Sequence, residues 1–276
     1  MKIIADSSFE ENKETREIMK VIQVPFHITI NGKNYIDDGS INIKELLKEI
    51  KESPKIAKTA CPSPTDYLKT FEKGISQIVV TISSKLSGSY SSAVVAKNMF
   101  LEEEDENAKI HILDSKTAAC GESLIALKLN ELNKLGFSFD EIIEHIQKYI
   151  DNLRTFFILE DLGTLSKSGR LNKVVGKIAT FISLRPIMKS SDGDIKMFKK
   201  VRGTKKAFSQ LIEVIQKDNV KFEDRVISIS HCNCYEKAEE LLKQILDKCP
   251  FKSAFIFEAN GLNTTYQNNG GIVITY

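Results

Sequence analysis

Residues 78–93 have the sequence IVVTISSKLSGSYSSA. The first five residues are apolar or β-branched, which is the composition of a strand that is buried on both faces. A turn rich in serine follows the strand and opens into a helix. A strand, a short polar turn and a helix in this order form the repeating unit of a parallel α/β sheet.

The same alternation continues on both sides of this unit. Three further strands are predicted at Lys2–Ala5, Ile22–Ile30 and Ile110–Leu113. Three helices are predicted at Ile43–Ile50, at Leu124–Leu135 before Gly136, and at Glu141–Leu153 with Asp140 as its cap. Asn31-Gly32 is a turn pair of the hairpin type. We therefore expect a mostly parallel, helix-covered sheet over residues 1–154.

The pattern changes near residue 154. A strand is predicted at Phe156–Leu159, a helix at Val174–Ile182, and a hairpin of Ile187–Lys189 and Ile195–Val201 around Ser191-Asp192-Gly193. Helices and strands then alternate at Ala207–Ile215, Val226–Ile229, Ala238–Leu246, Ser253–Phe257 and Ile272–Tyr276. The prediction is an α/β protein of two lobes, the second (155–276) having a mixed or antiparallel sheet with helices. Two units also suit the length of 276 residues.

Composition excludes several classes of function. The 39 basic and 37 acidic residues nearly balance, so nothing indicates a nucleic-acid partner. No apolar run approaches the ~18–20 residues of an integral membrane segment, and the polar start does not resemble a signal peptide, so a cytoplasmic protein is expected. The five cysteines include no CxxC pair and are expected to be free thiols. A structural metal at His231, Cys232 and Cys234 is the disfavoured alternative.

Polar residues follow three strands of the first lobe, at Asp6-Ser7-Ser8, Ser83-Ser84 and Asp114-Ser115. In an open parallel sheet, ligands bind beyond the carboxyl ends of the strands, so these residues are expected to converge on one polar patch. The alternative is that each serine or aspartate only caps a helix.

The turn Ser87-Gly88-Ser89 is the strongest candidate site. The first N–H groups of a helix are free and carry partial positive charge, which attracts a carboxylate or a phosphate. Gly88 allows an anion to approach the backbone closely, and the hydroxyls of Ser87 and Ser89 add donors. Thr59, in the rigid turn before Pro62, supplies another hydroxyl. The turn is neither a Walker loop nor a nucleophile elbow, and no histidine lies near it in the sequence.

An ordered set of motifs along nearly the whole chain resembles the DegV family, the fatty-acid-binding subunits of bacterial fatty acid kinase. The motifs are Asp6-Ser7-Ser8, Val24-Pro25-Phe26, Tyr35-Ile36-Asp37-Asp38, Thr59 with Pro62-Ser63, Ser83-Ser84 with Leu86-Ser87-Gly88-Ser89-Tyr90, Asp114-Ser115, Leu162 and Leu165 with Gly169-Arg170-Leu171, Pro186 before Asp192-Gly193, and Val201-Arg202-Gly203.

The resemblance implies a carrier that holds one long-chain fatty acid between its lobes, with no cofactor and no catalysis of its own. Such a carrier presents the carboxylate to the ATP-binding kinase subunit, and the acyl phosphate serves phospholipid synthesis. By resemblance, Thr59 and Ser87 bind the carboxylate, and Arg170 and Arg202 contact the phosphate or the partner.

Three positions depart from the family pattern. The usual T-S-Q-P-S is Thr59-Ala60-Cys61-Pro62-Ser63, and the usual S-G-T is Ser87-Gly88-Ser89. Near the end, Tyr266 begins a stretch that stands where the family often has a His-x-Gly-Pro-Gly turn. Tyr266 is therefore a candidate neighbour of the head group in place of a histidine.

Two features leave alternatives open. Apolar candidates for the wall of an acyl tunnel are Phe156, Phe157, Ile158, Phe181 and Ile182, although ordinary core is favoured for each one. The basic stretch Lys196, Lys199, Lys200, Arg202, Lys205 and Lys206 is either a solvated face or a docking surface for an acidic partner or an acyl phosphate.

A competing hypothesis for the function is an enzyme. In it, a metal-dependent phosphotransferase or phosphohydrolase uses Asp6, Asp114 and the Ser87 turn around Mg²⁺.

Overall fold

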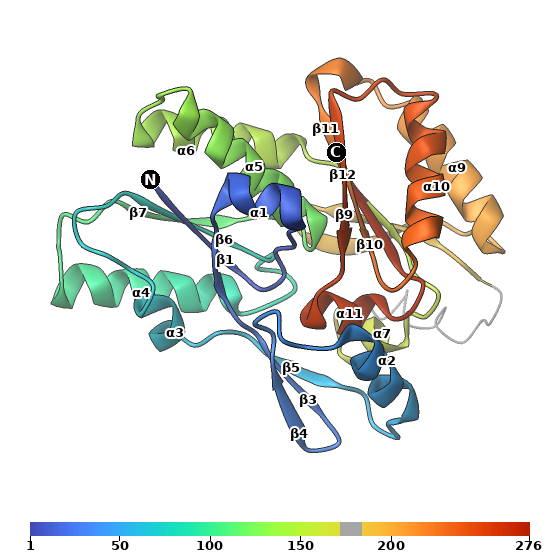
Figure 1. Ribbon diagram of the computed structural model, residues 1–276, viewed down its shortest axis with the longest axis horizontal. Coiled ribbons are helices and arrows are strands. Elements are labelled where there is room, and N and C mark those ends of the chain that lie inside the picture. Colours follow the sequence, from blue (N-terminus) through green and yellow to red (C-terminus); the bar gives the residue numbers. More distant parts are fainter. Residues whose placement is uncertain (172–183) are drawn as a thin grey trace.

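The computed structural model describes residues 1–171 and 184–276. Two sheets with their helices form two lobes, seen on the left and right of Figure 1, and a small third sheet lies below them. The predicted α/β class, with a parallel first sheet and a mixed second sheet, is confirmed. The predicted helix Val174–Ile182 lies outside the described residues.

The sheet of the first lobe is parallel throughout, in the order β2-β1-β6-β7. Its strands are β1 (Lys2–Asp6), β2 (Ile22–Val24), β6 (Gln77–Thr81) and β7 (Ile110–Asp114). All residues of β6 are buried, as its β-branched run predicts. Side chains alternate along the strand, so Val79 packs with one layer of helices while Ile78 and Val80 pack with the other.

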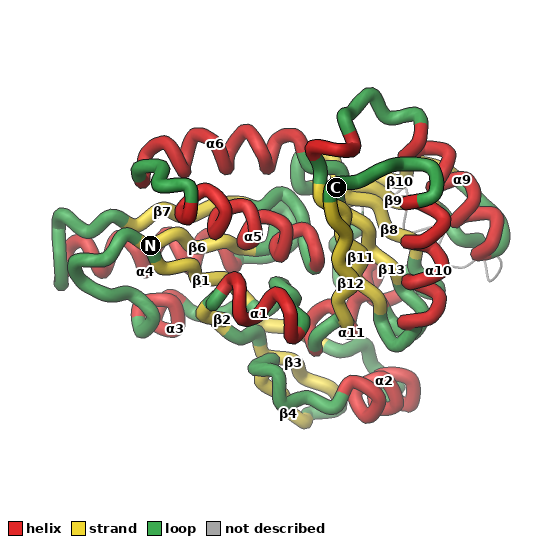
Figure 2. The backbone as a smooth tube through the Cα atoms, turned by 45° about the horizontal axis from the view of Figure 1, so that its top comes forward, coloured by secondary structure: helices red, strands yellow, loops and turns green. Residues whose placement is uncertain are grey.

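Helices cover both faces of this sheet (Figures 1 and 2). They are α1 (Lys13–Met19), α3 (Pro64–Leu68), α4 (Ser89–Glu103), α5 (Cys120–Lys134) and α6 (Phe139–Asn152). The predicted helix after the serine turn is therefore present as α4. Helix α5 begins four residues before the predicted Leu124. The predicted cap Asp140 is wrong, because Ser138 caps α6 and shares a capping box with Glu141.

A small antiparallel sheet, β4-β3-β5, was not predicted as a separate sheet. It consists of β3 (His27–Ile30), β4 (Lys33–Ile36) and β5 (Lys58–Ala60), and it packs with helix α2 (Ile43–Glu52). The predicted single strand Ile22–Ile30 is wrong because Pro25, which has no N–H, separates β2 from β3. The predicted Asn31-Gly32 turn is confirmed, with φ values of 50° and 82°.

The second lobe contains a six-stranded mixed sheet in the order β10-β9-β8-β13-β11-β12. Its strands are β8 (Thr155–Ile158), β9 (Ile187–Ser191), β10 (Asp194–Lys199), β11 (Val226–His231), β12 (Ser253–Glu258) and β13 (Ile272–Thr275). Its helices are α7 (Gly163–Lys167), α9 (Thr204–Gln216), the 3₁₀ turn η1 (Phe222–Asp224), α10 (Tyr235–Leu246) and α11 (Gly261–Gln267). The predicted hairpin is β9–β10, whose turn residues Asp192 and Gly193 both have positive φ.

Helix α11 joins the second lobe to the first. The carboxylate of Asp37, just after β4, accepts hydrogen bonds from the N–H groups of Gly261 (2.8 Å) and Leu262 (2.9 Å) at the first turn of α11. It also accepts a bond from the Ser7 hydroxyl (2.8 Å). Burial raises the pKa of Asp37 to about 6, against the lowering effect of these donors. One buried carboxylate thus fixes the helix that carries Leu262, Asn263 and Tyr266 toward the lobe boundary.

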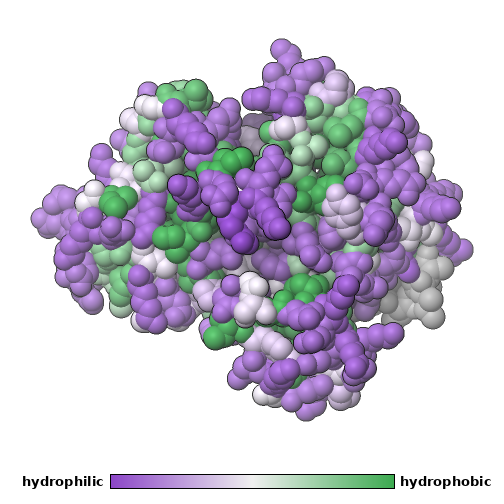
Figure 3. Space-filling model, viewed as in Figure 1, coloured by the Kyte–Doolittle hydropathy of each residue, from purple (hydrophilic) through white to green (hydrophobic). Residues whose placement is uncertain are grey.

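The surface is mixed in character. On the face drawn in Figure 3, the rim is mostly hydrophilic, and apolar side chains that reach the surface gather mainly nearer the centre. Within the described ranges, no helix combines the length and apolar character that crossing a membrane requires.

Candidate functional site

The three polar strand ends of the first lobe converge, as predicted. The carboxylate of Asp6, at the end of β1, accepts the backbone N–H of Ile82, which follows β6 (3.0 Å). Asp114, at the end of β7, accepts the N–H of Ser84 (3.1 Å). Asp6 is fully buried, and this burial raises its pKa to about 6. These contacts hold the ends of β1, β6 and β7 together.

The serine turn before α4 is held by its own backbone. The N–H groups of Leu86 and Ser87 donate to the carbonyl oxygen of Ser83, at 2.9 and 3.2 Å. The Ser87 hydroxyl accepts the N–H of Ser89 (3.2 Å), so its own hydrogen is free to donate to a ligand.

Two other residues of the turn differ from expectation. The buried Ser89 hydroxyl donates to Asp6 at 2.5 Å and bonds the Tyr67 hydroxyl at 2.6 Å. The prediction that this hydroxyl adds a donor at the head site is therefore wrong. Gly88, with φ of −75°, is not forced to be glycine, since an added Cβ would meet Cys61 Sγ at 3.5 Å, an ordinary contact. Close approach of an anion to Gly88 stays a prediction.

A mostly apolar cavity lies between the lobes, with an empty space of about 840 Å³ including its mouth. A concave, mostly apolar wall with a few polar groups is typical of a small-molecule site. The described residues that line it are Phe26, Thr59, Ile82, Leu86, Ser87, Thr117, Ala118, Ala119, Thr155, Phe157, Leu159, Leu165, Arg170, Ser190, Gly193, Ile195, Leu262, Asn263, Tyr266, Gln267 and Val273.

The predicted head-group residues share this cavity although they come from all parts of the chain. Thr59 lies on β5, Ser87 on the serine turn, Tyr266 on α11, and Arg170 follows α7. The hydroxyls of Thr59 and Tyr266 are 2.7 Å apart and hydrogen-bonded. Whichever of the two accepts in this pair keeps its own hydrogen free for a ligand.

Two backbone carbonyls orient Arg170. Its Nη1 donates to the carbonyl oxygen of Ser168 (2.7 Å) and its Nε donates to that of Leu86 (3.3 Å). The guanidinium carbon lies 6.0 Å from the centre of the Tyr266 ring. A fixed positive charge is thereby placed on the cavity wall next to the hydroxyl pair.

Arg202 lies elsewhere. It is exposed, pairs in an isolated bridge with Leu184, and is not among the described residues that line the cavity. The other members of the basic stretch around it are also exposed. Arg202 therefore does not share the cavity with Arg170, although the family resemblance gives both residues the same expected role.

Strand alternation explains the outcome for the tunnel candidates. Phe157 lines the cavity, whereas Phe156 and Ile158 face the opposite side of β8 and belong to the core under α9 and α10. Phe181 and Ile182 lie outside the described residues.

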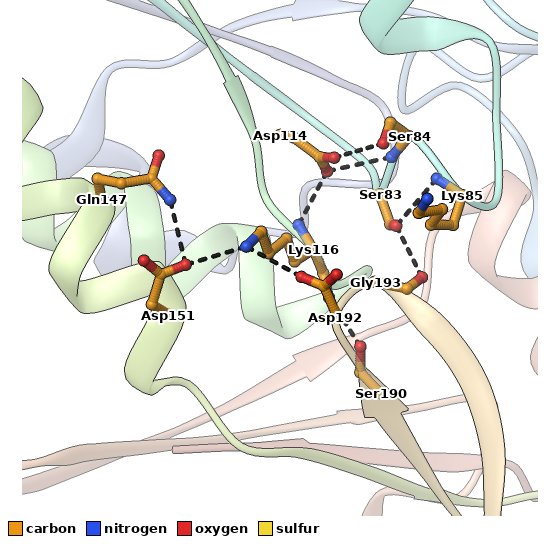
Figure 4. Close-up of polar contacts among 10 residues, drawn as sticks. All are labelled: Ser83, Ser84, Lys85, Asp114, Lys116, Gln147, Asp151, Ser190, Asp192 and Gly193. Carbon is orange, nitrogen blue, oxygen red and sulfur yellow. Dashed lines mark hydrogen bonds and ion pairs between the residues drawn. The ribbon is translucent and has the colours of Figure 1, made fainter.

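The tip of the β9–β10 hairpin lies against the cavity, which Gly193 lines. Figure 4 shows the contact of Gly193 with Ser83 of the first lobe. The Ser83 hydroxyl donates to the carbonyl oxygen of Gly193 at 2.7 Å. Gly193 has φ of +80°, and an added Cβ would lie 2.5 Å from Ser83 Oγ. Positive φ and the close approach both require glycine here. Ser190 and Ile195, from the two strands, also line the cavity.

An ion pair lies beside this buried contact. Lys116 Nζ is 3.1 Å from Asp151 Oδ1 at the end of α6 and 3.0 Å from Asp192 Oδ1 at the hairpin tip. Asp192 is 78% exposed, and such exposed pairs contribute little to stability. The buried Ser83–Gly193 bond is therefore the stronger restraint on the hairpin.

The arrangement does not favour the metal-dependent enzyme. The oxygens of Asp6 and Asp114 accept hydrogen bonds from different backbone amides, at Ser8 and Ile82 and at Ser84 and Lys116. In the described part of the chain, no group of three or more His, Cys, Asp or Glu side chains could hold a metal ion.

The cluster of His231, Cys232 and Cys234 does not favour a metal site either. All five cysteines are free thiols, as predicted. Near His231, burial raises the pKa of the Cys232 thiol to about 12, which opposes the thiolate form that binds a metal.

A buried polar network behind the cavity was not predicted. Glu10 Oε1 accepts bonds from the Ser230 hydroxyl (2.7 Å) and Asn263 Nδ2 (2.8 Å), while the Gln267 amide donates to Ser230 (2.9 Å). Burial raises the pKa of Glu10 to about 8. Asn263 and Gln267 also line the cavity. In the sequence, Asn263 and Gln267 are recognisable only as polar residues of a short helical segment. This pattern does not predict which residues they contact.

The DegV family model, whose description reads "Uncharacterised protein, DegV family", matches residues 1–276. This chain belongs to the DegV family. A DegV domain-containing protein of Streptococcus pyogenes serotype M1 is 34% identical over 278 residues, with 100% of this chain and 98% of that protein covered.

Solved DegV structures share the whole fold. A DegV family protein from Ruminococcus gnavus ATCC 29149, with vaccenic acid, is 38% identical with a TM-score of 0.94, covering 100% of this chain and 99% of that one. The Fatty Acid Kinase (Fak) B3 protein of Streptococcus pneumoniae, loaded with linoleic acid, is 30% identical with a TM-score of 0.90, covering 100% and 98%. A DegV family protein from Eubacterium eligens, loaded with heptadecanoic acid, is 28% identical with a TM-score of 0.90, covering 100% and 98%.

Proposed function

We propose that this chain binds a long-chain fatty acid in the cavity between its lobes and presents the carboxylate to the ATP-binding subunit of a fatty acid kinase. The observation that carries the proposal is the cavity itself, which is apolar over most of its wall and whose lining includes Arg170 and the hydroxyl residues Thr59, Ser87 and Tyr266. The fatty acids in the related solved structures support the ligand class.

Burial of the tail provides the affinity. The fourteen methylenes of a sixteen-carbon acid contribute roughly 11 kcal/mol at about 0.8 kcal/mol each. Lost rigid-body freedom costs about 4–15 kcal/mol, so the acid binds only if its head group adds no large penalty. An unpaired carboxylate removed from water would add such a penalty.

The head group is satisfied without a dedicated ion pair. The Ser87 hydroxyl and one hydroxyl of the Thr59–Tyr266 pair each have a hydrogen to donate, and charge-assisted bonds of this type are strong. Arg170 adds positive charge nearby. Tyr266 takes the position of the histidine that the family pattern has. In this proposal the chain performs no catalysis, and Arg202 contributes to the surface that a partner or an acyl phosphate meets.

Native mass spectrometry after incubation with palmitate or oleate tests the binding. The wild-type chain is expected to retain one acid. Ser87→Ala and the double variant Thr59→Ala with Tyr266→Phe are expected to reduce retention several-fold, because the first removes one donor and the second removes both hydroxyls of the pair. Ser91→Ala, on the exposed side of α4, is the matched control. A wild-type chain that retains no acid would falsify the proposal, and unchanged retention by both variants would refute the assigned head site.

Presentation has a separate test. With ATP and the kinase subunit, the acid-loaded chain is expected to yield acyl phosphate, whereas the chain and ATP alone are expected to yield none. Turnover of ATP or of phosphorylated compounds by the isolated chain would instead support the enzyme hypothesis.

A further inference from the structure

A second groove lies beside the head end of the cavity. Helix α2 and the segment leading to β5 form one wall, and α7 and the turn after α11 form the other. Its empty space of about 1780 Å³ includes open solvent, so it is an open groove and not an enclosed pocket. An open groove between a helix and several loop segments has a shape that a polypeptide segment can occupy.

The groove is strongly basic although the whole chain has a net charge of only +2. Its described lining includes two acidic side chains, Glu52 and Asp161, and five exposed lysines: Lys44, Lys48, Lys51, Lys55 and Lys167. The three lysines of α2 are spaced by four and three residues, which places them on one face of the helix. A concave surface lined by one sign of charge focuses the electrostatic field on an approaching partner.

These lysines are not neutralised within the described part of the protein. None of the five takes part in an ion pair there. By contrast, Glu49 on another face of α2 pairs with Lys33 at 2.8 Å. Glu49, the acidic residue of α2 that forms this ion pair, thus lies outside the groove and does not neutralise the groove lysines.

Half-buried apolar side chains lie among the lysines. Leu47, Ile50 and Ile56 line the groove with them. An apolar centre with a charged rim is the anatomy of a protein interface. A flat membrane surface cannot fill a concave groove, so a protein segment with both acidic and apolar side chains is the better complement.

The groove and the head site are adjacent along three chain segments. Ala57 in the groove is two residues from Thr59, Lys167 is three residues from Arg170, and Asn268 is two residues from Tyr266. Because an extended chain spans at most about 3.6 Å per residue, these Cα separations are at most about 7, 11 and 7 Å. An occupant of the groove therefore sits beside the head group.

We propose that this lysine groove is the docking surface for an acidic, partly apolar segment of the protein that acts on the bound carboxylate. The inference rests on the proposed function and adds where the partner binds. Docking here brings the partner to the head group from the side of α2 and α7 and leaves the acyl tail covered.

The test is the triple variant Lys44→Gln, Lys48→Gln and Lys51→Gln, loaded with oleate. Initial rates of acyl-phosphate formation are measured with ATP and the kinase subunit while the concentration of the loaded chain is varied. The apparent KM is expected to rise at least about tenfold, since focused charge raises association rates by roughly 10–10³. The kcat and the retention of oleate are expected to stay unchanged, and the salt dependence of the rate is expected to weaken.

The matched control removes three exposed lysines that do not line the groove, by Lys217→Gln, Lys243→Gln and Lys248→Gln. An unchanged KM in the groove variant, or an equal rise in the control, overturns the inference. So does a groove variant that loses binding to phosphatidylglycerol vesicles while its KM stays normal. Failure of the wild-type chain to retain oleate refutes the proposed function itself, which the mass measurement shows before any rate is taken.

Discussion

Replacing Glu10 with glutamine isolates one ionisable group in the buried network between the lobes. Glu10 Oε1 accepts from Ser230 and Asn263, and the carbonyl oxygen of a glutamine amide can accept the same two bonds. Glu10 Oε2 has no hydrogen-bond partner among the described residues. The substitution therefore keeps these contacts and removes the titration, at a cost for the unpaired amide NH2 group that does not depend on pH.

The magnitude follows from the pKa. Burial raises the pKa of Glu10 from 4.5 to about 8. Between these values the unfolded chain releases the proton while the folded chain keeps it, so the free energy of unfolding falls by about 1.4 kcal/mol per pH unit. The contribution is fully present below pH 4.5 and is lost as the pH rises to 8. Between pH 4.5 and pH 7 the stability of the variant relative to the wild type is expected to rise by up to about 3 kcal/mol.

Urea unfolding followed by circular dichroism, repeated from pH 4.5 to 8, measures this difference. The stability of Glu10→Gln relative to wild type is expected to increase steadily with pH from its value at pH 4.5. Glu102→Gln, on the exposed surface of α4, is the control and is expected to show no such trend. Parallel curves for wild type and Glu10→Gln would mean that Glu10 ionises in the folded chain at its ordinary pKa, and the reasoning would be refuted.

Two further substitutions test the supports of the site. Gly193→Ala is expected to lower the free energy of unfolding by more than about 1 kcal/mol, because φ is +80° and the new Cβ would lie 2.5 Å from Ser83 Oγ. Urea unfolding measures this loss. An unchanged urea midpoint would contradict the close packing of Gly193 against Ser83. Tyr67→Phe is expected to cost about 1–3 kcal/mol. The Ser89 hydroxyl donates its hydrogen to Asp6, so its buried oxygen accepts from the Tyr67 hydroxyl and would lose that donor. Thermal and urea unfolding check this, and a loss below about 0.5 kcal/mol would show that Ser89 finds another donor.

Local patterns in the sequence were sufficient for the elements around the site. The β-branched run before Ser83 is buried as predicted, and the serine turn leads into α4. The direction in which each side chain points was harder to predict from these patterns. Ser87 lies on the turn and Ser89 is the first residue of α4, so their directions depend on the conformation of the turn, which the local sequence does not specify. One hydroxyl consequently faces the cavity and the other faces Asp6.

Contacts between distant segments could not be predicted from local patterns. Asp37 caps a helix that begins 224 residues later, and Thr59 meets Tyr266 across 207 residues. An aspartate after a strand, or a tyrosine in a short helix, gives no local indication of such a partner. The motif that contains Asp37 marked the position as part of the family resemblance, but the physical role emerged only from the bond to α11.

The head site depends on how the lobes are held together, because no single lobe contains it. Thr59 comes from the small sheet, Ser87 from the first lobe, and Tyr266 and Arg170 from the second. Under the proposed function, a bound acid contacts all three units and therefore stabilises their association. By linkage this stabilisation is about 2.7 kcal/mol when free acid is present at 100 times its Kd. Acid binding and the burial of Glu10 then act on the same equilibrium between the lobes. Ionisation of Glu10 above pH 8 is therefore expected to weaken acid binding. This effect is expected although Glu10 is not among the described residues that line the cavity.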